Sequence, residues 1–308
     1  MRLSLAALVM ASLLPVVQAE AESIRLAAWN INNLNDVAGV ALRDRAPIRA
    51  EGDYVLLNDY RERLDPDVIA LQEMGNPKAA ARIFPPDQYE VIFEGRFQPD
   101  QPGDVHTALA VRKNKVRIIE KGDFEPLSVI HEADNRPVRR GVQALLEVAG
   151  DRFWVMSVHL KSGCFAKSLK PPSASQADCK TLAKQMAPLE QWIDEKESTG
   201  LPVIVMGDFN RKFDVHGQSD HLWAEVDDGQ PSPLNLWRLP FRTASECPTT
   251  RESDREFPID FLVFNEKAWP GVDQQSFFEL LYDDEDVSLG DRLSDHCPHA
   301  VDFTLGQH

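Results

Sequence analysis

Short apolar runs separated by polar turns recur along most of the chain. They are rich in Val, Ile, Leu and Phe, a composition typical of β-strands, several of which would be buried on both faces. The pattern predicts strands at residues 24–29, 68–71, 89–93, 107–111, 141–148, 153–158, 202–206, 257–264 and 300–304.

Two segments between these runs have helical patterns. Residues 53–63 have the composition of a helix, and residues 179–196 place Leu182, Met186, Leu189 and Ile193 on one stripe. Strands and helices alternate, yet residues 89–148 carry strands with hairpin-like spacing and no helix. The pattern therefore predicts mixed rather than purely parallel sheets, arranged as an α/β sandwich.

The first residues resemble a secretory signal more than part of a fold. Arg2 is followed by an apolar run that reaches Val17 and by the small-residue pattern Val17-Gln18-Ala19. This run is too short to span a bilayer, so we expect residues 1–19 to be a signal peptide that is removed on export. A buried first helix is the alternative. No later apolar segment is long enough for a span, so we expect a secreted or periplasmic protein without stable membrane insertion.

The rest of the chain carries no sign of division and is strongly acidic. No Gly/Ser-rich or Pro-rich linker and no fixed-period repeat interrupts it, so residues 20–308 are predicted to form one domain. The 33 basic and 49 acidic residues give a formal net charge of −16. Bulk electrostatics therefore disfavour nucleic acid, and a polyanionic substrate would need local cations. The oligomeric state stays open.

Four cysteines, an even count in a chain expected to be exported, favour disulfides over a zinc site, since none lies in a Cys-x-x-Cys pair. Three connectivities are possible. We expect Cys164 to pair with Cys179, because that link closes a short Pro/Ser-rich loop. The second link would then join Cys247 to Cys297 in the last third of the chain.

Polar side chains stand where several predicted strands end. Taken singly, each is an ordinary turn or loop residue, so their joint occurrence carries the argument. Two more lie near the C-terminus, one inside an apolar strand and one just before the last strand. The set comprises Asn30, Glu73, His159, Asp208, Asn210, Asp260 and the Asp295-His296 pair.

Six segments in a fixed order resemble the endonuclease/exonuclease/phosphatase superfamily. Its members include DNase I-like nucleases, abasic-site endonucleases, sphingomyelinases and inositol-polyphosphate 5-phosphatases. The segments span residues 29 to 296 and are Trp29-Asn30-Ile31, Leu71-Gln72-Glu73, Ser157-Val158-His159-Leu160, Gly207-Asp208-Phe209-Asn210, Ile259-Asp260-Phe261 and Ser294-Asp295-His296.

The resemblance implies a four-layer α/β sandwich with two mixed β-sheets, as in DNase I. It also implies a phosphoester hydrolase that uses Mg²⁺, or Mn²⁺ or Ca²⁺ in its place. By the family pattern, Glu73 and Asp295 would hold the metal, with Asn30 close by. Carboxylates suit such a hard ion, which takes only one or two of them.

The resemblance also assigns the remaining polar residues. Asp208 would orient or deprotonate the attacking water, and Asn210 would hold the phosphate. His296 would pair with Asp260, and His159 would face the phosphate oxygens. A buried aspartate beside a histidine favours the charged imidazolium, which suits stabilisation of a pentavalent phosphate.

Three cations are candidates for contact with the substrate. Related nucleases carry an arginine just before the strand at residue 141, which here is Arg139 or Arg140, with Arg139 favoured slightly. A solvated charged pair in a loop is the alternative. Lys161 follows His159 closely and should border the cleft.

Two positions depart from the family pattern. Asn32 stands where abasic-site endonucleases have an aspartate, which weakens any second metal contact there. The tyrosine and glutamate that DNase I places ahead of its mid-chain strand are not evident near His106, which could substitute for one of them or be a loop residue. His159 could then lack a carboxylate partner.

Three functions fit these features. The first is a secreted, nonspecific nuclease acting on DNA or RNA. The second is a phosphodiesterase or phosphatase for a phospholipid, like a sphingomyelinase, or for a small phosphorylated molecule. The third is a non-catalytic binding module of the same fold, against which the intact polar set argues. Substrate choice depends on loops whose conformation cannot be predicted from the sequence.

Overall fold

The computed structural model describes residues 22–98, 103–170, 176–230, 236–250, 252–289 and 292–306. The signal peptide expected at residues 1–19 lies outside them, so it stays a prediction, as does the single domain at 20–308. Among the described residues, no helix combines the length and the apolar character that a membrane span requires.

Strands and helices alternate over most of the described chain. The strands are β1 (Ser23–Leu34), β2 (Val68–Met74), β3 (Tyr89–Phe93), β4 (His106–Arg112), β5 (Arg117–Phe124), β6 (Gly141–Val148), β7 (Asp151–His159), β8 (Val203–Asp208), β9 (Trp237–Leu239), β10 (Asp260–Phe264), β11 (Val272–Glu279) and β12 (His299–Thr304). The helices are α1 (Glu51–Leu64), α2 (Pro77–Ile83), α3 (Ala177–Glu197), α4 (Phe213–His216), α5 (His221–Val226), α6 (Glu252–Arg255) and α7 (Asp284–Val287).

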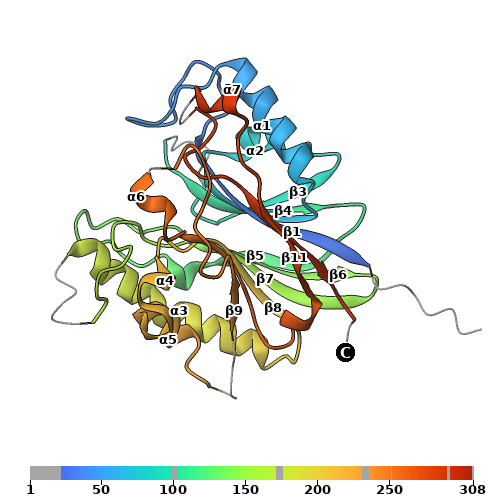
Figure 1. The fold of residues 1–308 in the computed structure, drawn as a ribbon, viewed down its shortest axis with the longest axis vertical. Helices are drawn as coiled ribbons and strands as arrows, with labels where there is room; N and C mark the ends of the chain where they lie inside the picture. The colour runs from blue at the N-terminus through green and yellow to red at the C-terminus, as the bar shows by residue number, and fades with distance from the viewer. Residues whose placement is uncertain are drawn as a thin grey trace, which may run out of the picture.

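These strands form two six-stranded mixed sheets. The first has the order β11-β12-β1-β2-β4-β3, and the second has the order β5-β6-β7-β8-β10-β9. Only the central pairs β1–β2 and β7–β8 are parallel among the pairings described. Helices α1 and α2 lie outside the first sheet, and α3 and α5 lie outside the second (Figure 1). The predicted four-layer sandwich is confirmed.

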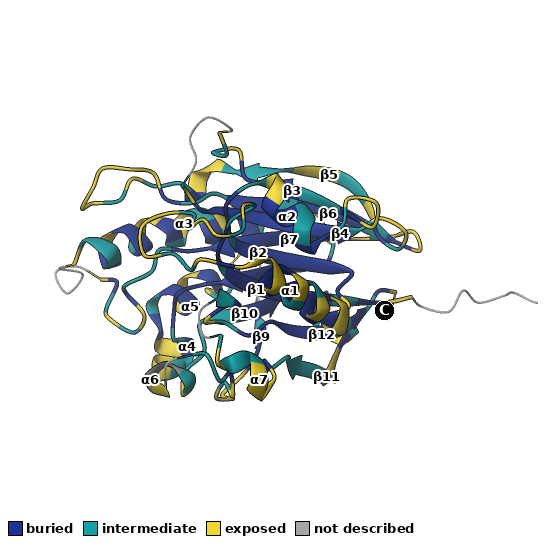
Figure 2. Ribbon diagram, turned by 90° about the horizontal axis from the view of Figure 1, so that it is seen from above, coloured by how far each residue is buried: buried dark blue, intermediate teal, exposed yellow. Residues whose placement is uncertain are grey.

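Three apolar layers hold the sandwich together. Side chains such as Leu26 and Met206 fill the space between the two sheets. Leu57 and Tyr60 of α1 pack on the outer face of the first sheet, and Leu182 of α3 packs on the second. Figure 2 shows the central strands buried and the outward face of α1 exposed. Burial of one such leucine stabilises the fold by about 1.5–3 kcal/mol.

Strands with an apolar run were predictable, and these included the edge strand β3. The sequence pattern missed β5, β9 and β11, and it began the strand ending at Phe264 three residues before Asp260. β5 and β11 lie at sheet edges and carry many exposed polar residues, so they lack the apolar run on which the prediction depends. The predicted helix at 179–196 extends over Ala177–Glu197, with Leu182, Leu189 and Ile193 buried.

Both predicted disulfides are confirmed. Cys164 and Cys179 join the loop after β7 to the start of α3, with their Cα atoms 5.0 Å apart. Cys247 and Cys297 have their Cα atoms 5.6 Å apart and tie the loop before α6 to the segment that precedes β12. The second link therefore braces the segment that carries Asp295 and His296.

Removal of either disulfide should lower stability, and the loss should be somewhat greater for the longer loop. The links span 15 and 50 residues, so the chain-entropy model predicts losses of about 3 and about 4 kcal/mol in the free energy of unfolding. Urea denaturation of Cys164→Ser/Cys179→Ser and Cys247→Ser/Cys297→Ser variants measures both. Unchanged midpoints in both variants would contradict the assigned role of these links.

Candidate active site

The polar strand ends meet in one cleft. Asn30 lies in β1 and Glu73 in β2, while His159 ends β7 and Asp208 ends β8. Within each parallel pair the strands finish at the same edge of the sheet. Asn30 Nδ2 donates a hydrogen bond across the two sheets to Asp208 Oδ2 at 3.1 Å. The resulting cleft has a volume of about 780 Å³.

The backbone is constrained where it delivers these side chains. Asn32, Asn33, Glu73 and Asn210 have φ between 40° and 60°, the left-handed region that most residues avoid. Such conformations are costly and gather at functional sites. Here they end regular pairing and turn the chain at the rim of the cleft.

Gly207 allows the two sheets to come close beside Asp208. Its φ is 131°, and a Cβ atom there would lie 2.3 Å from the carbonyl oxygen of Val158 and 2.5 Å from Gln72 Nε2. The first contact is with the backbone of the neighbouring strand β7, so it could not be relieved, and the second is with a side chain of the other sheet. The glycine of the Gly-Asp-Phe-Asn segment is therefore required by packing.

Glu73 is held by one of its carboxylate oxygens. Oε2 accepts hydrogen bonds from the Asn33 backbone N–H at 3.1 Å and from Asn33 Nδ2 at 2.7 Å. Oε1 lies 4.0 Å from His159 Nε2, and Arg43 lies 4.0 Å from Oε2. The side chain is thus oriented, with Oε1 left facing the cleft.

Asp260 and His296 form a tight pair. His296 Nδ1 and Asp260 Oδ2 are 2.6 Å apart. Burial lowers the pKa of His296, but the Asp260 carboxylate outweighs burial and holds that pKa well above its ordinary value. Burial likewise raises the pKa of Asp260, and His296 reverses the shift to a net lowering. The pair is therefore an imidazolium and a carboxylate at neutral pH.

The pKa of Asp208 is shifted in the opposite direction to that of Asp260. Burial, and then the nearby Asp260 carboxylate, raise its pKa to about 7. Its Oδ1 accepts the backbone N–H of Asn210 at 2.8 Å, and its Oδ2 lies 3.5 Å from His159 Nε2. A carboxylate with a pKa near neutrality is suited to accept a proton from water.

His159 is buried and neutral. Burial and then the Arg139 charge lower its pKa well below the ordinary value. Its Nδ1 hydrogen bonds to no described residue, whereas its Nε2 lies 3.5 Å from Asp208 Oδ2. Arg139 lines the cleft and donates to the carbonyl oxygens of His159 at 3.3 Å and Leu160 at 2.9 Å. Asn210 Nδ2 donates to the same Leu160 oxygen at 3.1 Å.

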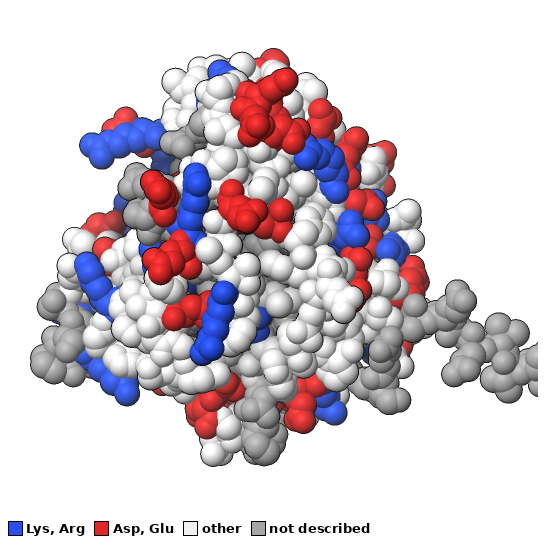
Figure 3. Space-filling view, viewed as in Figure 1, with Lys and Arg blue, Asp and Glu red and all other residues white. Residues whose placement is uncertain are grey.

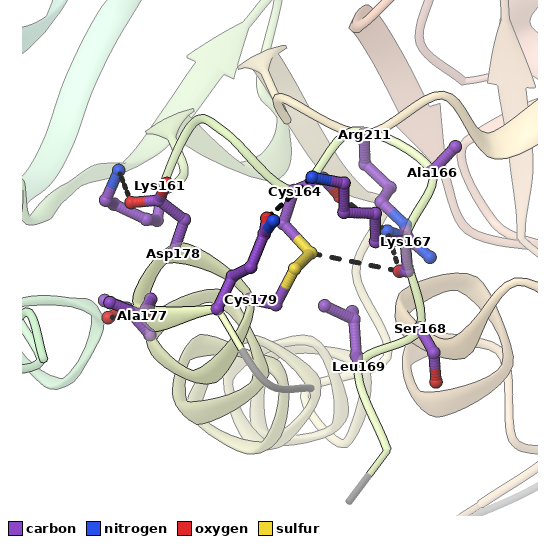
Figure 4. Close-up of a disulfide and its surroundings, with 12 residues drawn as sticks. Lys161, Cys164, Ala166, Lys167, Ser168, Leu169, Ala177, Asp178, Cys179 and Arg211 are labelled. Carbon is purple, nitrogen blue, oxygen red and sulfur yellow. Dashed lines mark hydrogen bonds and ion pairs between the residues drawn. A yellow bond between two sulfur atoms is a disulfide. The ribbon is translucent and has the colours of Figure 1, made fainter. Parts of the chain in front are cut away.

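The other two predicted cations are engaged by carboxylates. Arg140 contacts Asp123 at 2.6 Å and Glu125 at 2.9 Å. Lys161 Nζ lies 2.7 Å from Asp178 beside the Cys164–Cys179 disulfide (Figure 4). Neither side chain is among the described residues that line the cleft, whereas Arg139 is.

His106 also lies apart from the cleft. Its Nδ1 is 3.0 Å from Glu94 Oε1, and Glu94 also accepts hydrogen bonds from Arg96 and from the backbone N–H of Arg140. This buried network anchors the segment that leads into β6. His106 is not among the described residues that line the cleft.

The cleft has further lining residues that the sequence pattern did not reveal. Arg43, Lys212 and Glu246 come from loops, and a sequence alone does not fix how a loop folds. Glu279 ends the missed edge strand β11. His299 had a usable signal, since it is a histidine directly before an apolar run, much as Asp260 precedes Phe261-Leu262-Val263-Phe264.

Two groups of side chains have the chemistry to bind a cation. Glu73 Oε1 and the carboxylate of Asp295 line the cleft, and neither accepts a hydrogen bond from a described residue. Asp208, Asp260 and His296 place three ligand atoms within 4.8 Å of one another. In that second group Nδ1 of His296 already binds Asp260, and a protonated imidazole has no lone pair for a metal. The oxygen-only group therefore fits a hard divalent ion better.

Comparison with models of protein families identifies the family that the six sequence segments suggested. The model for the Endonuclease/Exonuclease/phosphatase family matches residues 27–296. The chain belongs to this family. Members typically hydrolyse phosphoester bonds and generally use divalent metals. Comparison with curated protein sequences gave no match.

Solved structures of the same fold cover nearly the whole chain. A family member from Bacteroides vulgatus is 14% identical, with 92% of this chain and 100% of that chain covered and a TM-score of 0.62. TDP2 from D. rerio, complexed with a single-strand DNA product, is 16% identical with coverages of 91% and 98% and a TM-score of 0.56. The mannosyl-6-phosphatase Bt3783 from Bacteroides thetaiotaomicron is 17% identical, with coverages of 90% and 98% and a TM-score of 0.54.

Arg49 joins the two segments that supply the proposed metal-binding side. It is 1% exposed, and its guanidinium donates to the carbonyl oxygens of Ile31, Asn32 and Asn33 in the last residues of β1. It also donates to the carbonyl oxygen of Leu293, just before Asp295, at 2.9 Å. Burial lowers the pKa of Arg49 to about 10, so the side chain remains charged at neutral pH.

Replacement of Arg49 by methionine should leave these buried carbonyl oxygens without donors. We expect a loss of about 3 kcal/mol in the free energy of unfolding, since each unsatisfied buried group costs about 1–3 kcal/mol. Arg45→Met is the matched control, because Arg45 is exposed in the same loop. Urea denaturation of both variants measures the difference, and equal stabilities would remove the bracing role of Arg49.

Proposed function

We propose that this chain is an exported, metal-dependent hydrolase of phosphodiester bonds. The observation that carries the proposal is the juxtaposition, within 4.8 Å, of Asp208 and the Asp260–His296 pair. One group there has a pKa near neutrality and the other is a buried imidazolium, so a proton acceptor and a positive charge lie side by side. Groups whose pKa values are pushed apart in this way are typical of acid–base catalysis.

The metal would be held by Glu73 and Asp295, with Asn30 close by. The unbonded Oε1 of Glu73 and the Asp295 carboxylate match the oxygen ligands that Mg²⁺ prefers, and Mn²⁺ or Ca²⁺ is the alternative. When bound, the ion would neutralise charge on the phosphate oxygens. Asn33 fixes the Glu73 carboxylate, and Arg49 braces the segment before Asp295.

The remaining side chains divide the work of hydrolysis. Asp208, oriented by Asn30, accepts a proton as the water oxygen bonds to phosphorus. The ester P–O bond breaks, and the leaving alkoxide takes a proton from water to become the alcohol. His296 stabilises the charge that develops on the phosphate, and Asp260 holds His296 in place. Hydrogen-bond donors for the phosphate oxygens come from Asn210, His159 and Arg139, on the wall of the cleft formed by the second sheet.

For the substrate, we propose nucleic acid, with DNA first and RNA second. Export agrees with the expected signal peptide and with two disulfides, which are typical of an oxidising compartment. Figure 3 shows Lys and Arg scattered among acidic side chains on one face. Binding should therefore be weak and sequence-nonspecific, with a shallow salt dependence, because few phosphates can be contacted at once.

Similarity to TDP2, which was solved with a single-strand DNA product, supports a nucleic-acid substrate, whereas similarity to a mannosyl-6-phosphatase favours a small phosphate ester. Linear DNA, RNA, sphingomyelin and bis(p-nitrophenyl) phosphate, each with Mg²⁺ and with chelator, separate these classes. Brisk hydrolysis of the small ester or the lipid without any cleavage of nucleic acid would exclude the nuclease.

Asp208→Ala and His296→Ala should each lower kcat by about 10² to 10⁴, the usual contribution of acid–base and charge-stabilising groups. Both variants should keep a Tm within a few degrees of the parent. Glu225→Ala is the control, because Glu225 is exposed on α5 and does not line the cleft. Near-normal turnover in either purified site variant would remove these assignments.

Chelation should abolish activity, and Glu73→Gln should weaken the response to metal. We expect the Mg²⁺ concentration for half-maximal rate to rise by about tenfold or more, because loss of a partner even in the outer shell of a metal site costs about 10–100-fold in affinity. A Mg²⁺ titration of rate in the parent, Glu73→Gln and Glu225→Gln measures this. Full activity in excess EDTA would refute metal dependence.

A further inference from the structure

Strand order sets the order of charges across the cleft. From one side to the other, the first sheet presents β2, β1, β12 and β11, and the second presents β7, β8 and β10. Arg43 lies beside Glu73 of β2, and Arg139 binds the end of β7. The cleft therefore has a cationic side at β2 and β7, with the Asn30–Asp208 bond near its middle.

The opposite side of the cleft is acidic. Glu279 ends β11, and its carboxylate accepts Ser245 Oγ at 2.7 Å and the Glu246 backbone N–H at 2.9 Å. Both glutamates line the cleft, and the Glu246 side chain is exposed. Neither is paired with a described cation, whereas the Asp260 carboxylate is already paired with His296.

A buried polar side chain lies on this acidic side with an unused hydrogen-bonding atom. His299 is 4% exposed, lines the cleft, and is paired in register with Glu279. Its Nε2 is buried and hydrogen bonds to no described residue. Its ring lies 5.9 Å from that of Phe277, which gives the wall an apolar surface beside the imidazole. Burial lowers the pKa of His299 to about 4, so the ring is neutral and offers one donor and one acceptor.

We propose that this side of the cleft, formed by His299, Phe277, Glu279 and Glu246, binds one uncharged, hydroxyl-bearing ring unit of the substrate, such as a nucleoside. A second phosphate there would meet two carboxylates, whereas Phe277 and the His299 ring offer a ring unit an apolar contact and a hydrogen-bonding partner. This inference rests on the proposed function and deepens it. The bond that is cleaved is then the last phosphodiester of a chain, or the bond of a small diester, and not a bond inside a continuous polyanion.

Dinucleotides that differ by one phosphate test this asymmetry. The probes are thymidylyl-thymidine with hydroxyls at both ends and its two singly phosphorylated forms, at the 5′ end and at the 3′ end. We expect one singly phosphorylated form to be cleaved at the central diester about tenfold more slowly than the uncharged-end probe, because like charges a few ångströms apart repel in a partly buried cleft. The other form, whose phosphate faces Arg139, should be cleaved at least as fast as the uncharged-end probe.

The variants Glu246→Gln and Glu246→Gln/Glu279→Gln should raise the kcat/KM of the slow probe relative to that of the uncharged-end probe, and the double variant should bring the two values close together. Glu225→Gln should change no ratio. Because the Glu246 side chain is exposed, the single variant should fold like the parent. Equal cleavage of all three probes, or a slow probe that neither variant speeds, would overturn the inference.

Hydrolysis of bis(p-nitrophenyl) phosphate shows whether a negative result contradicts only this inference or the proposed function as well. If neither this ester nor any dinucleotide is hydrolysed in Mg²⁺ or Mn²⁺, the proposed function is wrong and the inference falls with it. If this ester is hydrolysed and no dinucleotide is, the hydrolase stands, and a nucleoside is not the occupant of the acidic side.

Discussion

The candidate site depends on the close approach of two sheets at the ends of their central strands. Asn30 belongs to one sheet and Asp208 to the other, and the 3.1 Å hydrogen bond between them joins the two edges. Gly207 leaves room for this approach, because a Cβ there would lie 2.5 Å from Gln72 Nε2 of the first sheet. A wider separation would leave Glu73 and Asp295 on one wall and Asp208 and Asp260 on another, too far apart to act on one phosphate.

Burial in this junction sets the charges of the groups it brings together. Removal from water raises the pKa of Asp208 to about 7, whereas the Asp260–His296 contact keeps both partners charged. The same desolvation keeps His159 and His299 neutral. One packed interface thus holds a proton acceptor, a fixed cation and two neutral imidazoles within a single cleft. A charge is stabilised there only where it has a partner.

The sequence predicted the parts of this arrangement that depend on buried strands. Asn30, Glu73, His159 and Asp208 follow apolar runs, and the parallel pairs β1–β2 and β7–β8 bring such ends to one edge. The acidic side escaped prediction because β11 is a polar edge strand and Glu246 lies in a loop. Arg49 escaped because its partners are backbone carbonyls far along the chain, and no residue pattern records them. Arg140 resembles Arg139 in sequence, and only its contacts with Asp123 and Glu125 separate the two.

The most direct test of the account is the position of a bound cation. Crystals soaked in Mn²⁺ allow the ion to be located by anomalous scattering, without reference to turnover. The account predicts a peak between the carboxylates of Glu73 and Asp295, with His296 Nδ1 still bonded to Asp260. A peak between Asp208, Asp260 and His296 would contradict it, because His296 would then be a neutral ligand and not the cation that the proposed chemistry requires.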